Sequence, residues 1–264
     1  MLNGRVGEKK EKIMYEYVTR KEYQPVRLEL EEIIRKVHHY MRDKHNLAFQ
    51  HKLIGSGSRH LVTRIKGGNK GFDFDYNFIL PHPGEGYHWK ASVIKNQFTE
   101  ALKFALKGTK YSNPQDSTSA ITIKVVDRSK ASIKHSCDFA IIYYSEDEDF
   151  NGYYLKNWKR QNRYSFEQRI SSSNINEKID TILSYPNGWD MIKDEYIKLK
   201  NRNKDINKRS FVLYLESVNN VYNQLPDDDD ENESLFSPFV RWQKRTKIPF
   251  SLSTAVQNLF CERP

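Results

Sequence analysis

The N-terminal half of the chain carries two amphipathic helical patterns. Residues 26–45 and residues 89–108 both place apolar side chains three and four positions apart, which is the spacing of one helix face. These apolar positions are Leu30, Ile33, Ile34, Val37 and Met41 in the first segment, and Trp89, Val93, Phe98, Leu102 and Leu106 in the second. We therefore predict two helices, each with one buried face.

Segments rich in β-branched and aromatic residues surround these helices and predict strands. They cover residues 47–55, 72–80, 119–127 and 132–144, and residues 152–158 form a probable edge or hairpin strand. The stretch "SRHLVTRI" at 58–65 predicts a short helix that leaves a glycine–serine turn. "GGNKG" at 67–71 predicts a flexible loop.

The second half of the chain has a different pattern. Helical spacing of apolar residues dominates it, in the segments 171–183, 189–203, 208–225 and 252–260. An acidic low-complexity stretch at 226–234 separates the last two segments. We predict an α+β chain in which a mixed-sheet domain with an N-terminal helix, residues 1–160, precedes a mostly helical domain, residues 161–264.

Composition narrows the class of protein. The chain has 264 residues, a net charge of +9 and 13% aromatic residues, so we expect a folded protein. The positive charge fits either a lysine-rich surface or a partner that carries phosphates. Two cysteines, Cys137 and Cys261, cannot build a disulfide framework and form no CxxC zinc motif. We find no apolar signal segment and no membrane-length apolar run, and expect a soluble, cytoplasmic protein.

Two aspartates interrupt the apolar strand "FDFDYNFIL". Residues two apart on a strand point to the same face, so Asp73 and Asp75 project side by side. Two neighbouring carboxylates in a desolvated place repel each other, and a divalent cation such as Mg²⁺ relieves that repulsion. A polar face on an edge strand would show the same alternation.

A third carboxylate, Asp138, lies in the apolar stretch "SCDFAIIYY". Paired beside the first strand, it would complete a cluster able to hold two metal ions, which can clamp the attacking and leaving oxygens of a phosphoryl displacement. The alternative is an ordinary buried aspartate paired with a lysine. Other acidic runs, at 145–149 and 227–231, lack strand context and predict solvated loops.

The turn "IGSGSR" ends one predicted strand and opens a helix. Unpaired N–H groups at a helix start receive phosphate readily, and glycines 55 and 57 allow close approach of the backbone. Ser56 and Ser58 add hydroxyl donors. A phosphate-binding turn beside a metal cluster is the arrangement that a nucleoside triphosphate requires. A plain turn is the competing interpretation.

These motifs, in this order, resemble the DNA polymerase β-type nucleotidyltransferases. Gly55 and Ser56 match the family's glycine–serine pair, Asp73 and Asp75 match its metal-binding DxD, and Asp138 matches its third carboxylate. The resemblance covers about residues 50–145, and the helical half resembles in outline the template-independent members. Those members include poly(A) polymerases, oligoadenylate synthases and bacterial cyclic-oligonucleotide synthases. The "KGGNKG" insertion makes the segment before the DxD longer than in compact members.

The resemblance implies a Mg²⁺- or Mn²⁺-dependent enzyme that binds ATP or another NTP. Asp73, Asp75 and Asp138 would bind the metals, and the turn Gly55–Ser58 would bind the outer phosphates. In similar enzymes a lysine of the helical domain reaches the triphosphate, and within the basic stretch 193–210 Lys200 and Ser210 are our candidates. Trp189, Tyr196 and Tyr214 could stack on a base, although core packing is the better interpretation of each.

The sequence does not decide which hydroxyl group accepts the NMP. A basic surface admits RNA, and the resemblance admits a second nucleotide, a protein hydroxyl or a small molecule such as an antibiotic. A catalytically silent protein of the same fold that binds nucleotide or RNA is the alternative from another class.

Overall fold

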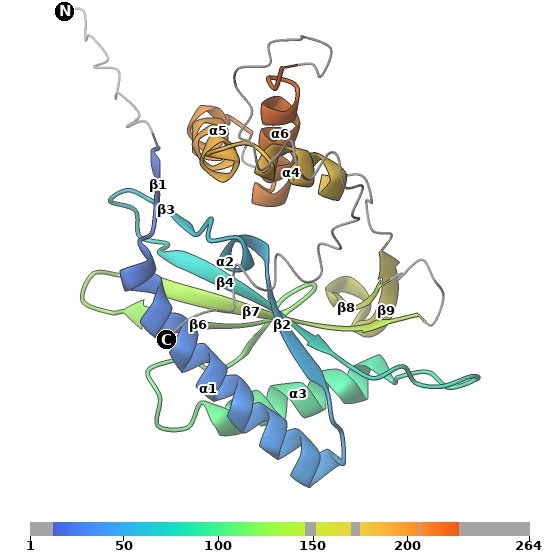
Figure 1. Ribbon diagram of the computed structural model, residues 1–264. Helices are drawn as coiled ribbons and strands as arrows, with labels where there is room; N and C mark the ends of the chain where they lie inside the picture. The colour runs from blue at the N-terminus through green and yellow to red at the C-terminus, as the bar shows by residue number, and fades with distance from the viewer. Residues whose placement is uncertain (1–12, 146–151, 170–174, 206, 227–264) are drawn as a thin grey trace, which may run out of the picture.

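The computed structural model describes residues 13–145, 152–169, 175–205 and 207–226. Its larger sheet runs in the order β2-β4-β7-β6-β5, and β8 and β9 extend it from β7 (Figure 1). The bounds of these strands are Gln50–Ile54 (β2), Phe72–Ile79 (β4), Gln115–Asp116 (β5), Ile121–Asp127 (β6), Ser132–Tyr144 (β7), Gly152–Trp158 (β8) and Arg163–Arg169 (β9). The pair β4–β7 is parallel and the other pairs are antiparallel, so the sheet is mixed as predicted.

Helices α1 (Arg20–His45) and α3 (Ala91–Ala105) cover one face of this sheet (Figure 1). Both were predicted from their apolar spacing, but α1 begins six residues earlier than the predicted 26. The N–H and hydroxyl groups of Thr19 both donate to the Glu22 carboxylate, which fixes the start of the helix there. Leu30, Phe78 and Phe98, all fully buried, belong to the core between these helices and the sheet.

The segment 58–65 was wrongly predicted as a helix. The helix there is a single turn, α2 (Gly55–Ser58), and Thr63–Ile65 forms strand β3. β3 pairs antiparallel with β1 (Tyr15–Tyr17), which lies far away in the sequence. No local sequence pattern predicts β1. Pairing with β1 satisfies the backbone N–H and C=O groups of β3, which favours a strand over the predicted helix.

Strand β9 was not predicted. It pairs with β8 along its whole length, and a short 3-10 helix, η1 (Lys159–Gln161), joins the two strands. Tyr164 and Phe166 pack against the core of the sheet. The sheet thus continues past residue 160, at which we placed the domain boundary.

Helices α4 (Ile175–Leu183), α5 (Gly188–Arg202) and α6 (Ser210–Tyr222) form a second layer on the other side of the sheet (Figure 1). They match three of the four predicted helices, and the fourth, at 252–260, lies outside the described residues. A separate apolar core that includes Ile182, Ile192 and Val218 holds them together. None of the described helices has the length and apolar character to cross a membrane.

Candidate active site

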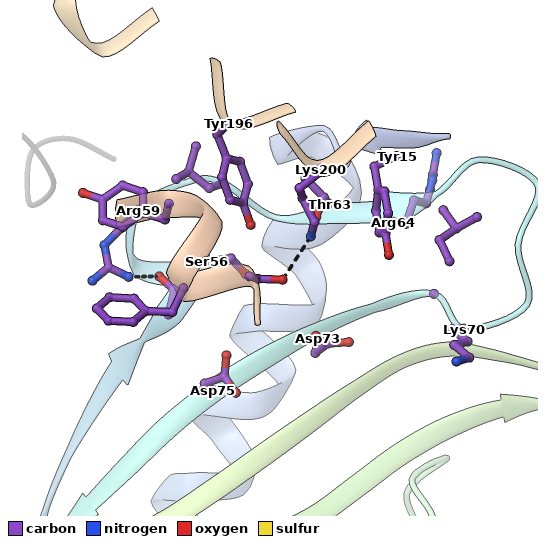
Figure 2. A pocket seen from close by; sticks show the side chains of 17 residues that line it. Tyr15, Ser56, Arg59, Thr63, Arg64, Lys70, Asp73, Asp75, Tyr196 and Lys200 are labelled. Carbon is purple, nitrogen blue, oxygen red and sulfur yellow. Dashed lines mark hydrogen bonds between the residues drawn. The ribbon is translucent and has the colours of Figure 1, made fainter. Parts of the chain in front are cut away.

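A cavity of about 310 Å³ lies between the sheet and the helical layer (Figure 2). Strand β4 contributes Asp73 and Asp75, and helix α5 contributes Lys200. The turn at α2 contributes Gly55 and Ser56. The structure therefore brings together predicted site residues that are more than 140 positions apart in the sequence. Gly57, Ser58 and Asp138 do not line the cavity.

The alternation of β4 aims the two aspartates at this cavity. Phe72, Phe74 and Tyr76 are buried in the core on one side, which leaves Asp73 and Asp75 facing the cavity on the other. Figure 2 shows both carboxylates projecting from the same strand. The edge-strand alternative is excluded, because β4 lies between β2 and β7.

Asp138 lies on β7 directly beside Asp75, because the two residues are partners in the parallel register. Partners in a sheet point to the same face, so Asp138 and the β4 aspartates share one side. The Asp138 carboxylate accepts a hydrogen bond from the Thr122 hydroxyl on β6. The hydroxyl of Ser136, which pairs with Asp73 in the sheet, lies 3.5 Å from the Asp73 carboxylate. The predicted side-by-side arrangement of the two acidic strands is confirmed.

These carboxylates perturb one another. Burial, together with Asp73 and Asp138, raises the pKa of Asp75 to about 7. Burial and the Asp138 carboxylate also raise the pKa of Asp73, which the Lys200 ammonium partly opposes. In the described part of the chain no lysine, arginine or histidine lies within ion-pair distance of these three carboxylates. Among the described residues, these carboxylates therefore have no ion-pair partner.

The donor set fits a divalent cation by its chemistry. Hard cations prefer oxygen ligands, and a cation would relieve the repulsion that raises these pKa values. Among the described residues, however, no three acidic, histidine or cysteine side chains converge on one point as a preformed metal site. The hydrogen bond from Thr122 orients the Asp138 carboxylate, the third of the predicted cluster.

Gly55 makes the closest approach to the acidic strand. Its φ of +66° favours glycine, and a Cβ at this position would lie 2.6 Å from Oδ2 of Asp75. Gly57 is small for another reason, because its Cβ would lie 2.8 Å from the Phe74 ring. The Ser58 hydroxyl donates to the Gly55 carbonyl oxygen. Only Gly55 and Ser56 of this turn thus face the cavity.

Lys200 enters the cavity from the helical layer, above Asp73 (Figure 2). Its Nζ donates hydrogen bonds of 2.7 Å to the Thr63 hydroxyl and 3.2 Å to the Ser210 hydroxyl. Burial lowers the pKa of Lys200 to about 8. The predicted pair Lys200 and Ser210 therefore meets at the cavity wall.

Arg59 and Tyr15 line the cavity and were missed. Arg59 follows the glycine–serine turn directly, and its guanidinium lies 4.6 Å from the centre of the Tyr214 ring while donating to the Gly55 carbonyl. Tyr15 reaches the cavity through strand β1, with Lys200 Nζ 4.5 Å from its ring centre. The position of Arg59 after the turn was a usable signal, but nothing local signals Tyr15.

Tyr196 and Tyr214 belong to the second core, as predicted, and also border the cavity. Both side chains are nearly inaccessible to solvent. Trp189 packs against the same core and does not line the cavity.

Solved structures share this architecture. The Vibrio cholerae DncV cyclic AMP-GMP synthase, a prokaryotic cGAS homolog, superposes with a TM-score of 0.55 at 12% identity, covering 83% of this chain and 70% of that one. Its apo form gives a TM-score of 0.52 at 12% identity, covering 82% and 70%. The chain shares the fold of this synthase. This confirms the fold class predicted from the glycine–serine turn and the three aspartates.

A further similar structure is that of E. coli MS115-1 CdnC with ATP, with a TM-score of 0.47 and 13% identity, covering 80% of this chain. The chain spans 63% of the CdnC chain. No family model matches the sequence, and no curated protein matches it.

Proposed function

We propose that this chain is a metal-dependent nucleotidyltransferase that moves an NMP from an NTP to a hydroxyl acceptor and releases pyrophosphate. The observation that carries the proposal is the placement of Asp73 and Asp75 opposite Lys200, in one cavity of the nucleotidyltransferase fold. Carboxylates on one wall and an ammonium on the other suit a triphosphate that bridges them together with a cation.

The residues of the cavity have different roles in binding the triphosphate. Lys200, held by Thr63 and Ser210, places a positive charge for the outer phosphates. Ser56 offers a hydroxyl donor to the same phosphates, and Gly55 keeps the turn close to Asp75. These contacts orient the α phosphate for in-line attack, so catalysis rests on positioning and on charge stabilisation.

Asp73, Asp75 and Asp138 would hold the divalent cation, Mg²⁺ or Mn²⁺. When bound, the cation neutralises phosphate charge and lowers the pKa of an acceptor hydroxyl. Asp138, on the neighbouring strand beside Asp75, would accept the proton of that hydroxyl, the role that the family resemblance implies for it. The hydrogen bond from the Thr122 hydroxyl fixes the orientation of the Asp138 carboxylate.

The acceptor that we propose is a nucleotide hydroxyl, either of a free nucleotide or at the end of an RNA strand. DncV is named as a synthase of cyclic AMP-GMP, a product that joins two nucleotides. The net charge of +9 also favours acceptors that carry phosphates over a neutral small molecule.

The test is incubation with each α-labelled NTP, Mg²⁺ or Mn²⁺, and nucleotide or RNA acceptors, followed by separation of the products. The proposal predicts label in a new phosphodiester product with wild type and none with Asp75→Asn. Recovery of unchanged NTP under every combination, despite measurable NTP binding, would instead identify a catalytically silent nucleotide-binding protein.

A further inference from the structure

The acidic face of the sheet continues beyond the cavity onto the hairpin of β8 and β9. Ile142 lies four residues after Asp138 on β7 and therefore on the same side. Tyr154 pairs with Ile142, so Tyr154, Lys156 and Trp158 also point to that side. Across the hairpin, Arg163 pairs with Trp158.

The opposite side of the hairpin is committed to packing. Leu155 is buried there, and Tyr153, Tyr164 and Phe166 contact the core of the sheet. The side that points away from the core carries a different set of side chains, which we name the hairpin face. It consists of Tyr154, Lys156, Trp158, Arg163, Ser165, Glu167 and Arg169.

Cations and aromatic rings alternate on the hairpin face. Lys156 Nζ lies 3.6 Å from the centre of the Trp158 ring. The Arg169 guanidinium lies 4.3 Å from the centre of the Tyr154 ring. Within the described residues, no carboxylate lies within ion-pair distance of the cations of this face. Glu167, which pairs with Tyr154 and therefore lies on the same face, accepts a hydrogen bond from the Ser165 hydroxyl. This hydrogen bond and the charges of Lys156 and Arg163 lower the pKa of Glu167. With three cations and one carboxylate, the described side chains of this face carry a net positive charge.

The hairpin is fixed in place from behind. Lys95, a buried residue of α3, forms an ion pair of 2.6 Å with Asp116. Asp116 accepts further hydrogen bonds from the Asn157 amide on β8 and from the Tyr164 hydroxyl on β9. These contacts hold the hairpin beside β5, so the hairpin face is a supported surface and not a loose loop.

We propose that the hairpin face binds a single-stranded polynucleotide and leads its end toward Asp75 and Asp138, a step that rests on the proposed function. Aromatic rings such as those of the half-buried Tyr154 and Trp158 stack on unpaired bases, and interleaved cations contact the phosphates. A duplex hides its bases and offers no such stacking. The basic stretch 193–210 is less available, because Lys193, Lys198 and Lys208 form ion pairs with acidic neighbours.

The test measures fluorescence anisotropy of a labelled 12-nucleotide single-stranded RNA, a duplex of equal length and heparin as competitor. Trp158→Ala should weaken binding of the single strand by about five-fold or more, whereas Trp158→Phe, which keeps a ring, should restore it. Arg163→Glu should also reduce the log–log salt slope by about 0.7 for the lost phosphate contact. Arg128→Glu, an exposed arginine in the β6–β7 turn, is the matched control and should bind as wild type.

Each other outcome overturns the inference. If Arg163→Glu weakens binding but Trp158→Ala does not, the surface is a general polyanion site. Equal binding of duplex and single strand would also identify a general polyanion site. Binding is measured without turnover, so failure here is separable from failure of the proposed function. NTP turnover without RNA binding removes this inference alone, whereas RNA binding that depends on Trp158, without turnover, removes only the proposed function.

Discussion

The ammonium group of Lys200 donates a hydrogen bond of 2.7 Å to the Thr63 hydroxyl, joining helix α5 to strand β3 across the cavity. The two residues are 137 positions apart in the sequence. The bond fixes, at the rim of the acidic site, the lysine whose charge partly opposes the rise in the pKa of Asp73. It is the contact through which the helical layer reaches the proposed triphosphate position.

Replacing Lys200 should weaken NTP binding. Lys200→Ala removes a charged donor to phosphate, so we expect the affinity for ATP to fall about ten-fold or more. AMP affinity should change less, because the outer phosphates are the proposed partners. Equilibrium titration with both nucleotides measures the difference, and an equal loss for ATP and AMP would place Lys200 elsewhere in the site.

NTP binding should also depend on pH. Burial lowers the pKa of Lys200 to about 8, and the ammonium is charged only below its pKa. The affinity of the wild type should therefore fall as the pH rises through about 8. Lys200→Arg, which stays charged, should give an affinity that is flat over the same range. A parallel decline in both proteins would assign the pH dependence to another group.

Asp75→Asn should abolish transfer and stabilise the metal-free protein at alkaline pH. The pKa of Asp75 is raised to about 7 in the fold, above the value of about 4 in an unfolded chain, so the wild type loses stability as the pH rises from about 4 to about 7. Asn carries no charge, and the gain in Tm should be larger at pH 8 than at pH 5. A gain of about 1 kcal/mol corresponds to about 2–4 °C.

Two controls accompany that melt. Asp43→Asn changes an exposed aspartate at the end of α1 and should shift Tm little at either pH. Mg²⁺ should raise the Tm of the wild type and lose most of this effect in Asp75→Asn. A wild type that Mg²⁺ does not stabilise, beside an active Asp75→Asn variant, would show that the acidic cluster is structural.

Gly55→Ala tests the close approach to Asp75, with Gly67→Ala as a matched control. Both glycines have positive φ, +66° and +68°, but an added Cβ meets Asp75 at Gly55 and nothing within 4 Å at Gly67. Gly67→Ala should cost about 1 kcal/mol of folding free energy for the backbone conformation alone. Gly55→Ala should cost more and lose activity. Equal losses in denaturant melts would mean that Asp75 can move aside freely.

Local sequence patterns predicted most of the sheet and the acidic site. Asp73 and Asp75 stand out because alternation on a strand is a local property, and Asp138 because it interrupts another apolar strand. Strand β3 was misassigned because its partner β1 lies far away along the chain. β9 was missed because only Tyr164 and Phe166 in it are apolar, while the surrounding residues are polar.

Side chains that enter the site from other elements were harder to predict. Lys200 came from the family resemblance and not from its local pattern, since lysines of α5 look alike in sequence. Tyr15 reaches the cavity only because β1 pairs with β3. Gly57 was expected to approach phosphate, yet it is small because the Phe74 ring lies against it. Such roles depend on tertiary contacts that a single sequence does not display.

The central claim is transfer of the α phosphate, and isotope position tests it most directly. Two reactions with Mg²⁺ and an acceptor mixture of nucleotides and RNA should be run in parallel, one with α-labelled and one with γ-labelled NTP. The account predicts α label in a new phosphodiester and γ label only in pyrophosphate, with both signals lost in Asp75→Asn. Transfer of the γ label to a product, or its release as inorganic phosphate, would contradict it.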